Sequence, residues 1–226
     1  IMLSVCVLVL ATAGERITYK MVIDRLTPFR TALVLAVLGL SMVVYNIIVF
    51  FKRAFTHDIT EDMTQFASRP LLLIALLDTL IFGVQTISAS GVSPTMTVIL
   101  LHANTPIIVY GSHCAFPERK YGEVQNRGAQ IIALAILVSI SRPIIDLTTD
   151  ENMAYSAATL MYVGASALQG FVMLFKEKCL TEYGKRMDCL CLCAWLFTYQ
   201  FAIALVLSPL FYILQDLLSN EPQGFP

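Results

Sequence analysis

The chain alternates between long apolar stretches and short polar gaps, and this pattern sets the solvent in which it folds. A helix crosses the hydrocarbon core of a bilayer with about 20 apolar residues. Because a backbone in lipid must satisfy its own hydrogen bonds, each apolar stretch of this length is predicted to be a helix. Hydropathy windows place seven predicted spans at residues 1–23, 30–51, 71–90, 94–116, 129–147, 154–175 and 190–214.

The composition agrees with an all-α membrane protein. Of 226 residues, 57% are hydrophobic and only 14% are charged, and the mean hydropathy is +0.73. The net charge of −1 provides no basic field for nucleic acid. The sequence has no Gly-rich phosphate loop, no HExxH motif and no nucleophile–base set. We therefore predict no enzyme, no cofactor and no metal site.

The basic residues predict an orientation in the membrane. Ten of the 15 Lys and Arg residues lie in the second, fourth and sixth gaps between spans. Because short cytosolic loops are enriched in Lys and Arg, these gaps and the N-terminus are predicted to be cytosolic. The first apolar run has no basic residue before it and no initial Met, unlike a signal peptide. We interpret it as a first helix that is cut short.

The first and sixth spans end in similar acidic–basic sequences, which indicates an internal repeat. Aligning Glu15 with Glu177 gives an offset of 162 residues. The same offset carries the second span onto residues 192–213, where the seventh span lies. The repeat unit is therefore predicted to contain five helices.

An odd number of helices inverts the second repeat relative to the first, as in many secondary transporters. We predict that residues 1–147 form the first repeat and residues 154–226 the first two helices of the second. The parent fold would then have ten helices in a 5+5 inverted repeat, of which this chain holds seven and lacks the last three.

Asp78 is the strongest candidate for a functional residue. It lies inside the third span with apolar neighbours on both sides, and Gln85 follows two turns later on the same helix face. A carboxylate at this depth needs a partner or a proton, and such groups usually mark a transport path. A hydrogen bond between helices is the alternative explanation.

Other polar residues are candidates in the remaining spans. Arg16 and Lys20 share a face near the end of the first span, and Glu177 follows the sixth span. These charges either line a cavity or sit at the membrane interface. The fourth span contains His102 and Asn104 before Pro106, and this proline is predicted to kink the helix one turn earlier.

Several stretches together resemble the chloroquine-resistance-transporter family of the drug/metabolite transporter superfamily. The family usually has Gln where this chain has His102. Arg16 and Lys20 match two basic positions of the malarial members, in which the residue aligned with Arg16 governs drug transport; Glu15 replaces an Asn. The resemblance rests on Leu76-Leu77-Asp78, Thr97 to Pro106, Arg119-Lys120-Tyr121, and Lys176-Glu177 to Tyr183-Gly184-Lys185.

The resemblance implies ten helices, cytosolic termini and a central cavity. It further implies proton-coupled export of peptides, amino acids, thiols such as glutathione, or cationic drugs from an acidic vacuole or a plastid. On this interpretation Asp78 and Glu177 bind protons or cations, and the other five candidates line the solute path. These five are Arg16, Lys20, Gln85, His102 and Asn104. The partners would be a small organic solute, protons and the lipid bilayer, and the protein would be a monomer.

Three alternatives remain open from the sequence. A nucleotide-sugar or triose-phosphate exchanger of the same superfamily would need more basic residues within the spans to hold phosphate. A seven-helix receptor would match the number of spans but would have no internal repeat. A membrane-embedded enzyme would need a nucleophile–base or metal set.

Overall fold

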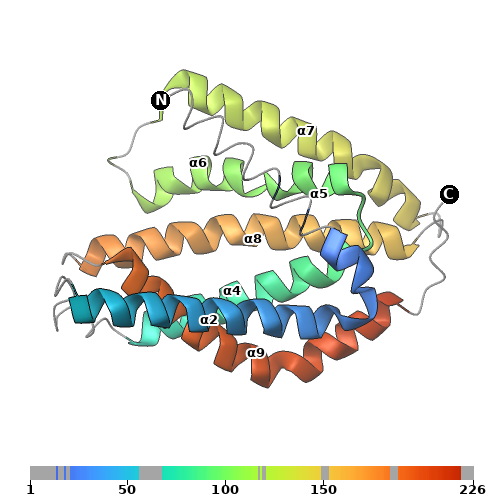
Figure 1. Cartoon of the computed structure of the whole chain (residues 1–226). Coiled ribbons are helices and arrows are strands. Elements are labelled where there is room, and N and C mark those ends of the chain that lie inside the picture. The colour runs from blue at the N-terminus through green and yellow to red at the C-terminus, as the bar shows by residue number, and fades with distance from the viewer. Residues whose placement is uncertain are drawn as a thin grey trace.

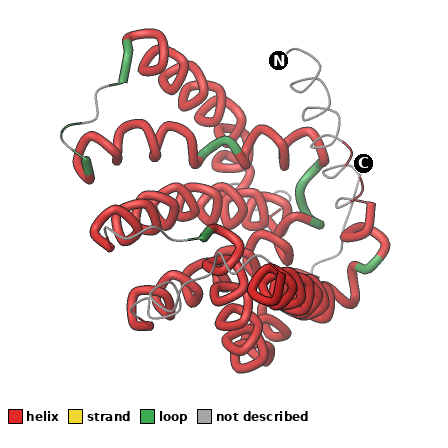
Figure 2. Tube along the Cα trace, turned by 60° about the vertical axis from the view of Figure 1, so that its left-hand side comes forward, coloured by secondary structure: helices red, strands yellow, loops and turns green. Residues whose placement is uncertain are grey.

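The computed structural model describes residues 21–55, 68–116, 121–148, 153–183 and 188–219, together with Gly14, Thr18 and Glu118. Every regular element in these ranges is helical (Figure 2). Most of the predicted first span, including Arg16 and Lys20, lies outside the described residues. Residues 21–25 are helical and lead into a 3-10 turn, η1 (Thr27–Phe29), which contains Pro28 and precedes the next helix.

Five described helices are long and apolar enough to cross a membrane. They agree with an integral membrane protein that is all-helical in its described ranges, and they confirm that five of the predicted spans are continuous helices. The number of seven spans and the inverted repeat stay predictions. The five helices are α2 (Arg30–Phe55), α4 (Ser68–Ala89), α7 (Glu123–Thr148), α8 (Met153–Tyr183) and α9 (Cys189–Ser219).

The predicted span at 94–116 is two short helices rather than one kinked helix. α5 (Pro94–Leu101) ends at His102, and α6 (Asn104–Ala115) begins two residues later. Pro106 has no N–H to donate to the carbonyl of His102, one turn earlier. That carbonyl instead accepts from the N–H of Thr105 at 3.0 Å. The distortion lies where it was predicted, and it is large enough to divide the span into two helices joined by a turn at His102 and Ala103.

The described helices form one bundle around α8 (Figure 1). On one side, α8 packs against α4, which packs against α9, and α9 packs against α2. On its other side, α8 contacts α5, α6 and α7. We call the end of the bundle where α2 and α8 begin the Arg30 end, and the opposite end, where α2 stops and α9 starts, the Lys52 end.

Apolar side chains fill the helix contacts and also cover much of the outside. Val34 and Leu38 of α2 meet Ala204 and Phe211 of α9 in one buried cluster. A second cluster joins α4, α8 and α9. Large apolar residues are exposed along α2 and α7, as expected for helices that face lipid tails. They include Leu40, Val43, Val44, Ile47, Phe50 and Phe51 of α2 and Ile131, Leu134, Leu137 and Val138 of α7.

Candidate functional site

Asp78 lies where three helices meet. It is the eleventh of 22 residues in α4, near the middle of a helix long and apolar enough to cross a membrane. Its Oδ2 lies 2.5 Å from Nζ of Lys176 on α8 and accepts a hydrogen bond from Nε2 of Gln200 on α9 at 3.0 Å. The Asp78 and Lys176 side chains are 16% and 30% exposed, so both charges are largely removed from water.

The contact between α4 and α9 fixes the position of Gln200. Thr79, the residue after Asp78, is fully buried and its hydroxyl donates to the carbonyl of Ala75 at 2.7 Å. The same hydroxyl lies 3.4 Å from the backbone carbonyl of Gln200. α4 therefore holds Gln200 by its backbone as well as by its side-chain amide, which orients the amide toward the carboxylate.

A second polar contact lies two turns farther along α4. Nε2 of Gln85 donates to Oγ of Ser166 at 3.2 Å and to Oε1 of Gln169 at 3.3 Å, both on α8. The Ser166 hydroxyl donates in turn to the carbonyl of Tyr162 at 2.9 Å. Polar groups thus continue along the α4–α8 contact toward the Arg30 end. We call the set the polar line, and its members are Asp78, Gln85, Ser166, Gln169, Lys176 and Gln200.

Equal spacing on two antiparallel helices produces this line. Asp78 and Gln85 are seven residues apart, as are Gln169 and Lys176. Seven residues make two helical turns, so each pair presents its two side chains on one face. Because α4 and α8 run in opposite directions, Asp78 meets Lys176 while Gln85 meets Gln169.

Two other predicted residues lie elsewhere. His102 is exposed at the break between α5 and α6. Asn104 begins α6, and its Oδ1 accepts a hydrogen bond from the Thr105 hydroxyl at 3.3 Å. Its backbone oxygen approaches α8 so closely that a Cβ added to Gly170 would lie 2.9 Å away. The structure therefore assigns Asn104 a packing position beside α8.

Lys176 was predicted to lie in the gap after the sixth span, and it was not predicted as the partner of Asp78. The predicted span stopped at residue 175, whereas α8 continues through Tyr183. Lys176 is therefore within the helix, and the seven-residue spacing from Gln169 could have revealed its face. Glu177, the predicted residue beside it, is half-buried on α8, and its backbone carbonyl accepts from the Thr181 hydroxyl at 2.8 Å.

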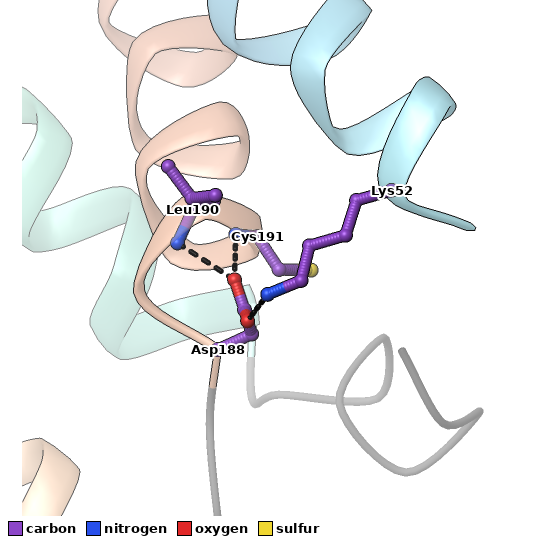
Figure 3. Close-up of polar contacts among 4 residues, drawn as sticks. All are labelled: Lys52, Asp188, Leu190 and Cys191. Carbon is purple, nitrogen blue, oxygen red and sulfur yellow. Dashed lines mark hydrogen bonds and ion pairs between the residues drawn. The ribbon is translucent and has the colours of Figure 1, made fainter. Parts of the chain in front are cut away.

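A separate polar contact joins α2 to α9 at the Lys52 end (Figure 3). Asp188 precedes α9, and its Oδ1 accepts from the backbone N–H groups of Leu190 at 2.9 Å and Cys191 at 3.3 Å. Its Oδ2 pairs with the ammonium of Lys52. The hydrogen bond from Lys52 lowers the pKa of Asp188, and the two N–H groups lower it further, against the opposing effect of burial. Asp188 therefore caps α9 and ties it to α2.

Within the described ranges, no three His, Cys, Asp or Glu residues are grouped as a metal site requires. Packed apolar helices long enough to cross a membrane, with an ion pair and amides between them, are typical of a multi-pass membrane protein. The chain belongs to the CRT-like (chloroquine-resistance transporter-like) family, which it matches over residues 1–223. This is a family of transporters, and the resemblance found in the sequence is confirmed. No curated protein and no solved structure matches the chain.

Proposed function

We propose that this protein is a proton-coupled secondary transporter that moves small organic solutes by alternating access. The solutes are peptides, amino acids, thiols such as glutathione, or cationic amines, and the membrane is that of an acidic vacuole or a plastid, with the N-terminus in the cytosol. The observation that carries the proposal is the Asp78–Lys176 ion pair, which links α4 to α8 at bilayer depth with Gln200 of α9 on the same oxygen.

Protonation of Asp78 would change the attraction between α4 and α8. A proton on the carboxylate removes the negative charge that holds Lys176 in place. The lysine stem is long enough for its ammonium to move toward the Lys52 end, where water is accessible. α8 then loses its ionic tie to α4, and release of the proton restores it.

The free energy of breaking this ion pair is comparable to the free energy needed to shift a protein between two conformations. Removing one partner of a buried ion pair costs about 3–5 kcal/mol. Moving a two-state equilibrium from 1:99 to 99:1 takes about 5.5 kcal/mol. The charge state of a single pair can therefore supply most of the bias between two conformations of the bundle.

The remaining polar groups are proposed to contact the solute. The amide and hydroxyl groups of Gln85, Ser166 and Gln169 can both donate and accept hydrogen bonds. Their present hydrogen bonds to one another can therefore be replaced by hydrogen bonds to a solute. Arg16, Lys20, His102 and Asn104 remain proposed path residues, and Glu177 a proposed second proton or cation site.

Uptake into proteoliposomes tests the proposal. The complete protein is assayed with a dipeptide, glutathione and a cationic amine, with and without an imposed pH gradient. We expect gradient-driven uptake of at least one of them. Asp78→Asn should abolish the response to the gradient while leaving exchange without a gradient, because Asn retains the shape and the contact with Gln200.

Glu182→Gln is the matched control, since it removes an acidic charge from an exposed position on α8. It should leave the gradient response unchanged. An Asp78→Asn variant that still follows the gradient would exclude Asp78 from the coupling. A protein that takes up none of the three solutes would favour the exchanger of phosphorylated solutes or the receptor.

A further inference from the structure

The guanidinium group of Arg30 is buried with part of its hydrogen-bonding capacity unused. Arg30 is the first residue of α2 and is 1% exposed. Its Nη1 donates to the backbone carbonyl of Ile87, in the last turn of α4, at 3.0 Å. Among the residues that the structure describes, Nε and Nη2 have no hydrogen-bond partner. Buried donors are nearly always paired, so these two require an explanation.

Loose packing at this end of the bundle is not the explanation. Thr31, the next residue, donates from its backbone N–H and its hydroxyl to Oε1 of Gln215 at 3.0 and 2.9 Å. The amide of Gln215 donates in turn to the carbonyl of Pro28 at 2.8 Å. The polar groups of Thr31 and Pro28, on either side of Arg30, are therefore satisfied by Gln215, whereas two donors of Arg30 are not.

The two unpaired nitrogens form one edge of the guanidinium plane. The N–H bonds of Nε and Nη2 point in the same direction, and this fork matches the two oxygens of a carboxylate. The Ile87 carbonyl occupies Nη1 and leaves this edge available. A neutral amide or an amine cannot satisfy two parallel donors in the same way, because neither offers two acceptor atoms at that spacing.

The electrostatics of the position also favour an anion. Arg30 stands at the N-terminus of a 26-residue helix, where the aligned peptide dipoles add positive potential. Asp24, on the helical segment before η1, is an acidic residue whose charge attracts the Arg30 guanidinium. Its side chain is exposed, and it does not hydrogen-bond Nε or Nη2 of Arg30. Ser156, near the start of α8 at the same end of the bundle, has a buried hydroxyl that is likewise unpartnered among the described residues.

We propose that the Nε–Nη2 edge of Arg30 binds an oxyanion, the carboxylate of the transported solute. The proposal rests on the transport function proposed above and adds a position that selects solutes with a free carboxylate. Arg30 is then a specificity residue at the Arg30 end of the bundle, whereas Asp78 and Lys176 respond to protons at mid-membrane depth.

Competition between a dipeptide and its C-terminal amide tests the proposal in proteoliposomes containing the complete protein. The wild type should take up the dipeptide with a KM at least tenfold lower than that of the amide. Arg30→Lys keeps the charge and can still reach the Ile87 carbonyl but lacks the fork, so it should reduce this preference. Arg30→Gln should remove it while uptake of a cationic amine continues. Arg25→Gln removes the same charge from an exposed position and should leave the preference intact.

Inorganic phosphate identifies the source of the oxyanion. If the site binds a free anion instead of the solute, phosphate will change uptake of dipeptide and amide equally, and this outcome would overturn the assignment to the solute. An Arg30→Gln variant that transports and still prefers the dipeptide would also overturn it. If the wild type transports neither the peptides nor the amine, the transport proposal itself fails.

A binding measurement covers the case in which the Arg30 variants do not fold. The melting temperature of the wild type in detergent should rise with the dipeptide and not with its amide. Equal shifts from the two compounds, or no shift from either, would contradict a carboxylate site at Arg30.

Discussion

Two helix pairs in this bundle place their polar contacts in opposite ways. The α4–α8 pair has its ion pair and amide contacts in the middle, at Asp78–Lys176 and Gln85–Gln169. The α2–α9 pair is polar at both ends and mostly apolar between them. Its interior carries aromatic and aliphatic contacts, such as the stacked rings of Tyr45 and Phe197 with centroids 5.0 Å apart.

This difference suggests that the α2–α9 pair is fixed, whereas the α4–α8 contact can change with protonation. Polar contacts between described residues tie α2 to α9 along their length: Lys52 with Asp188 at one end, Thr31 with Gln215 at the other, and Asn46 with Thr198 between them. No change of protonation near neutral pH breaks the last two. The α4–α8 contact, by contrast, includes an ion pair that depends on the charge of one carboxylate. We expect α2 and α9 to move together, and α8 to move relative to α4.

The largest expected effect is the loss of Lys176. Lys176→Met leaves Asp78 without a counter-charge, and we expect it to lower the free energy of unfolding by about 3 kcal/mol. Adding Asp78→Asn to this variant should restore much of that loss, because the uncompensated charge is then gone. Urea or thermal unfolding in detergent gives both values. A single Lys176→Met variant within about 0.5 kcal/mol of wild type would show that the pair contributes little.

The second effect is the loss of the neutral tie between α2 and α9. Gln215→Leu removes the partner of Thr31 and of the Pro28 carbonyl and leaves these groups buried. We expect a loss of about 2 kcal/mol. Asp216→Asn changes the exposed neighbour and should stay within about 0.5 kcal/mol of wild type. Equal stabilities of the two variants would mean that the apolar contacts alone hold α2 to α9.

The third effect compares two glycines on α8. A Cβ at Gly170 would lie 2.9 Å from the Asn104 carbonyl oxygen, whereas Gly164 has open space around it. Gly170→Ala should cost about 1.5 kcal/mol through overpacking against α6. Gly164→Ala should stabilise the helix by up to about 1 kcal/mol, because Ala favours the helix over Gly. Thermal unfolding should therefore shift in opposite directions, and shifts of the same sign would contradict the close approach of α6 to α8.

The smallest effects are expected at the Lys52 end. Asp188→Asn keeps a side chain that caps α9 and loses only the pair with Lys52, which is about 0.5 kcal/mol for a partly exposed pair. Asp188→Ala loses the cap as well and should cost about 1 kcal/mol more. High salt should reduce the difference between wild type and Asp188→Asn and leave the cap contribution unchanged. If Asp188→Asn and Asp188→Ala lose the same stability, the whole contribution of Asp188 comes from its ion pair with Lys52 and none from the cap.

Asp188 also gives a pH dependence with a definite sign. The pKa of folded Asp188 lies below that of unfolded aspartate, which is about 3.9. Near pH 4 the unfolded chain therefore binds more protons at this site than the folded one. The contribution of Asp188 is complete above about pH 5 and is lost as the pH falls through the lowered pKa. The stability difference between wild type and Asp188→Asn, measured from pH 6 to pH 3, should shrink over that range.

Hydropathy predicted the fold where a helix is long and faces lipid. The five confirmed spans agree with α2, α4, α7, α8 and α9 to within five residues, except at the start of α7, six residues earlier than predicted, and at the end of α8, eight residues later. Pro106 predicted the place of the distortion at His102, but hydropathy alone assigned residues 94–116 to one span because they contain no Asp, Glu, Lys or Arg. The break depends on Pro106 and on the packing of α6 against Gly170 of α8.

The candidate site was predicted in part for a similar reason. Asp78 could be predicted because a carboxylate among apolar residues is easily recognised in the sequence. Gln85 could be predicted because it lies two helical turns later, so both were predicted on one face of the same helix. Lys176 adjoins a charged loop sequence, and nothing in local hydropathy separates it from interfacial lysines. Its pairing with Asp78 depends on the register of α8 against α4, which is a property of the tertiary fold.

The break between α5 and α6 has a consequence for how the protein enters the membrane. With eight and 12 residues, the two helices are about 12 and 18 Å long, and each falls short of a hydrocarbon core of about 30 Å. The insertion machinery responds to hydropathy, and residues 94–116 contain no Asp, Glu, Lys or Arg. The segment is therefore expected to enter as one transmembrane unit during synthesis. We expect the bend at His102 to form after insertion, once α8 supplies the surface on which both halves pack.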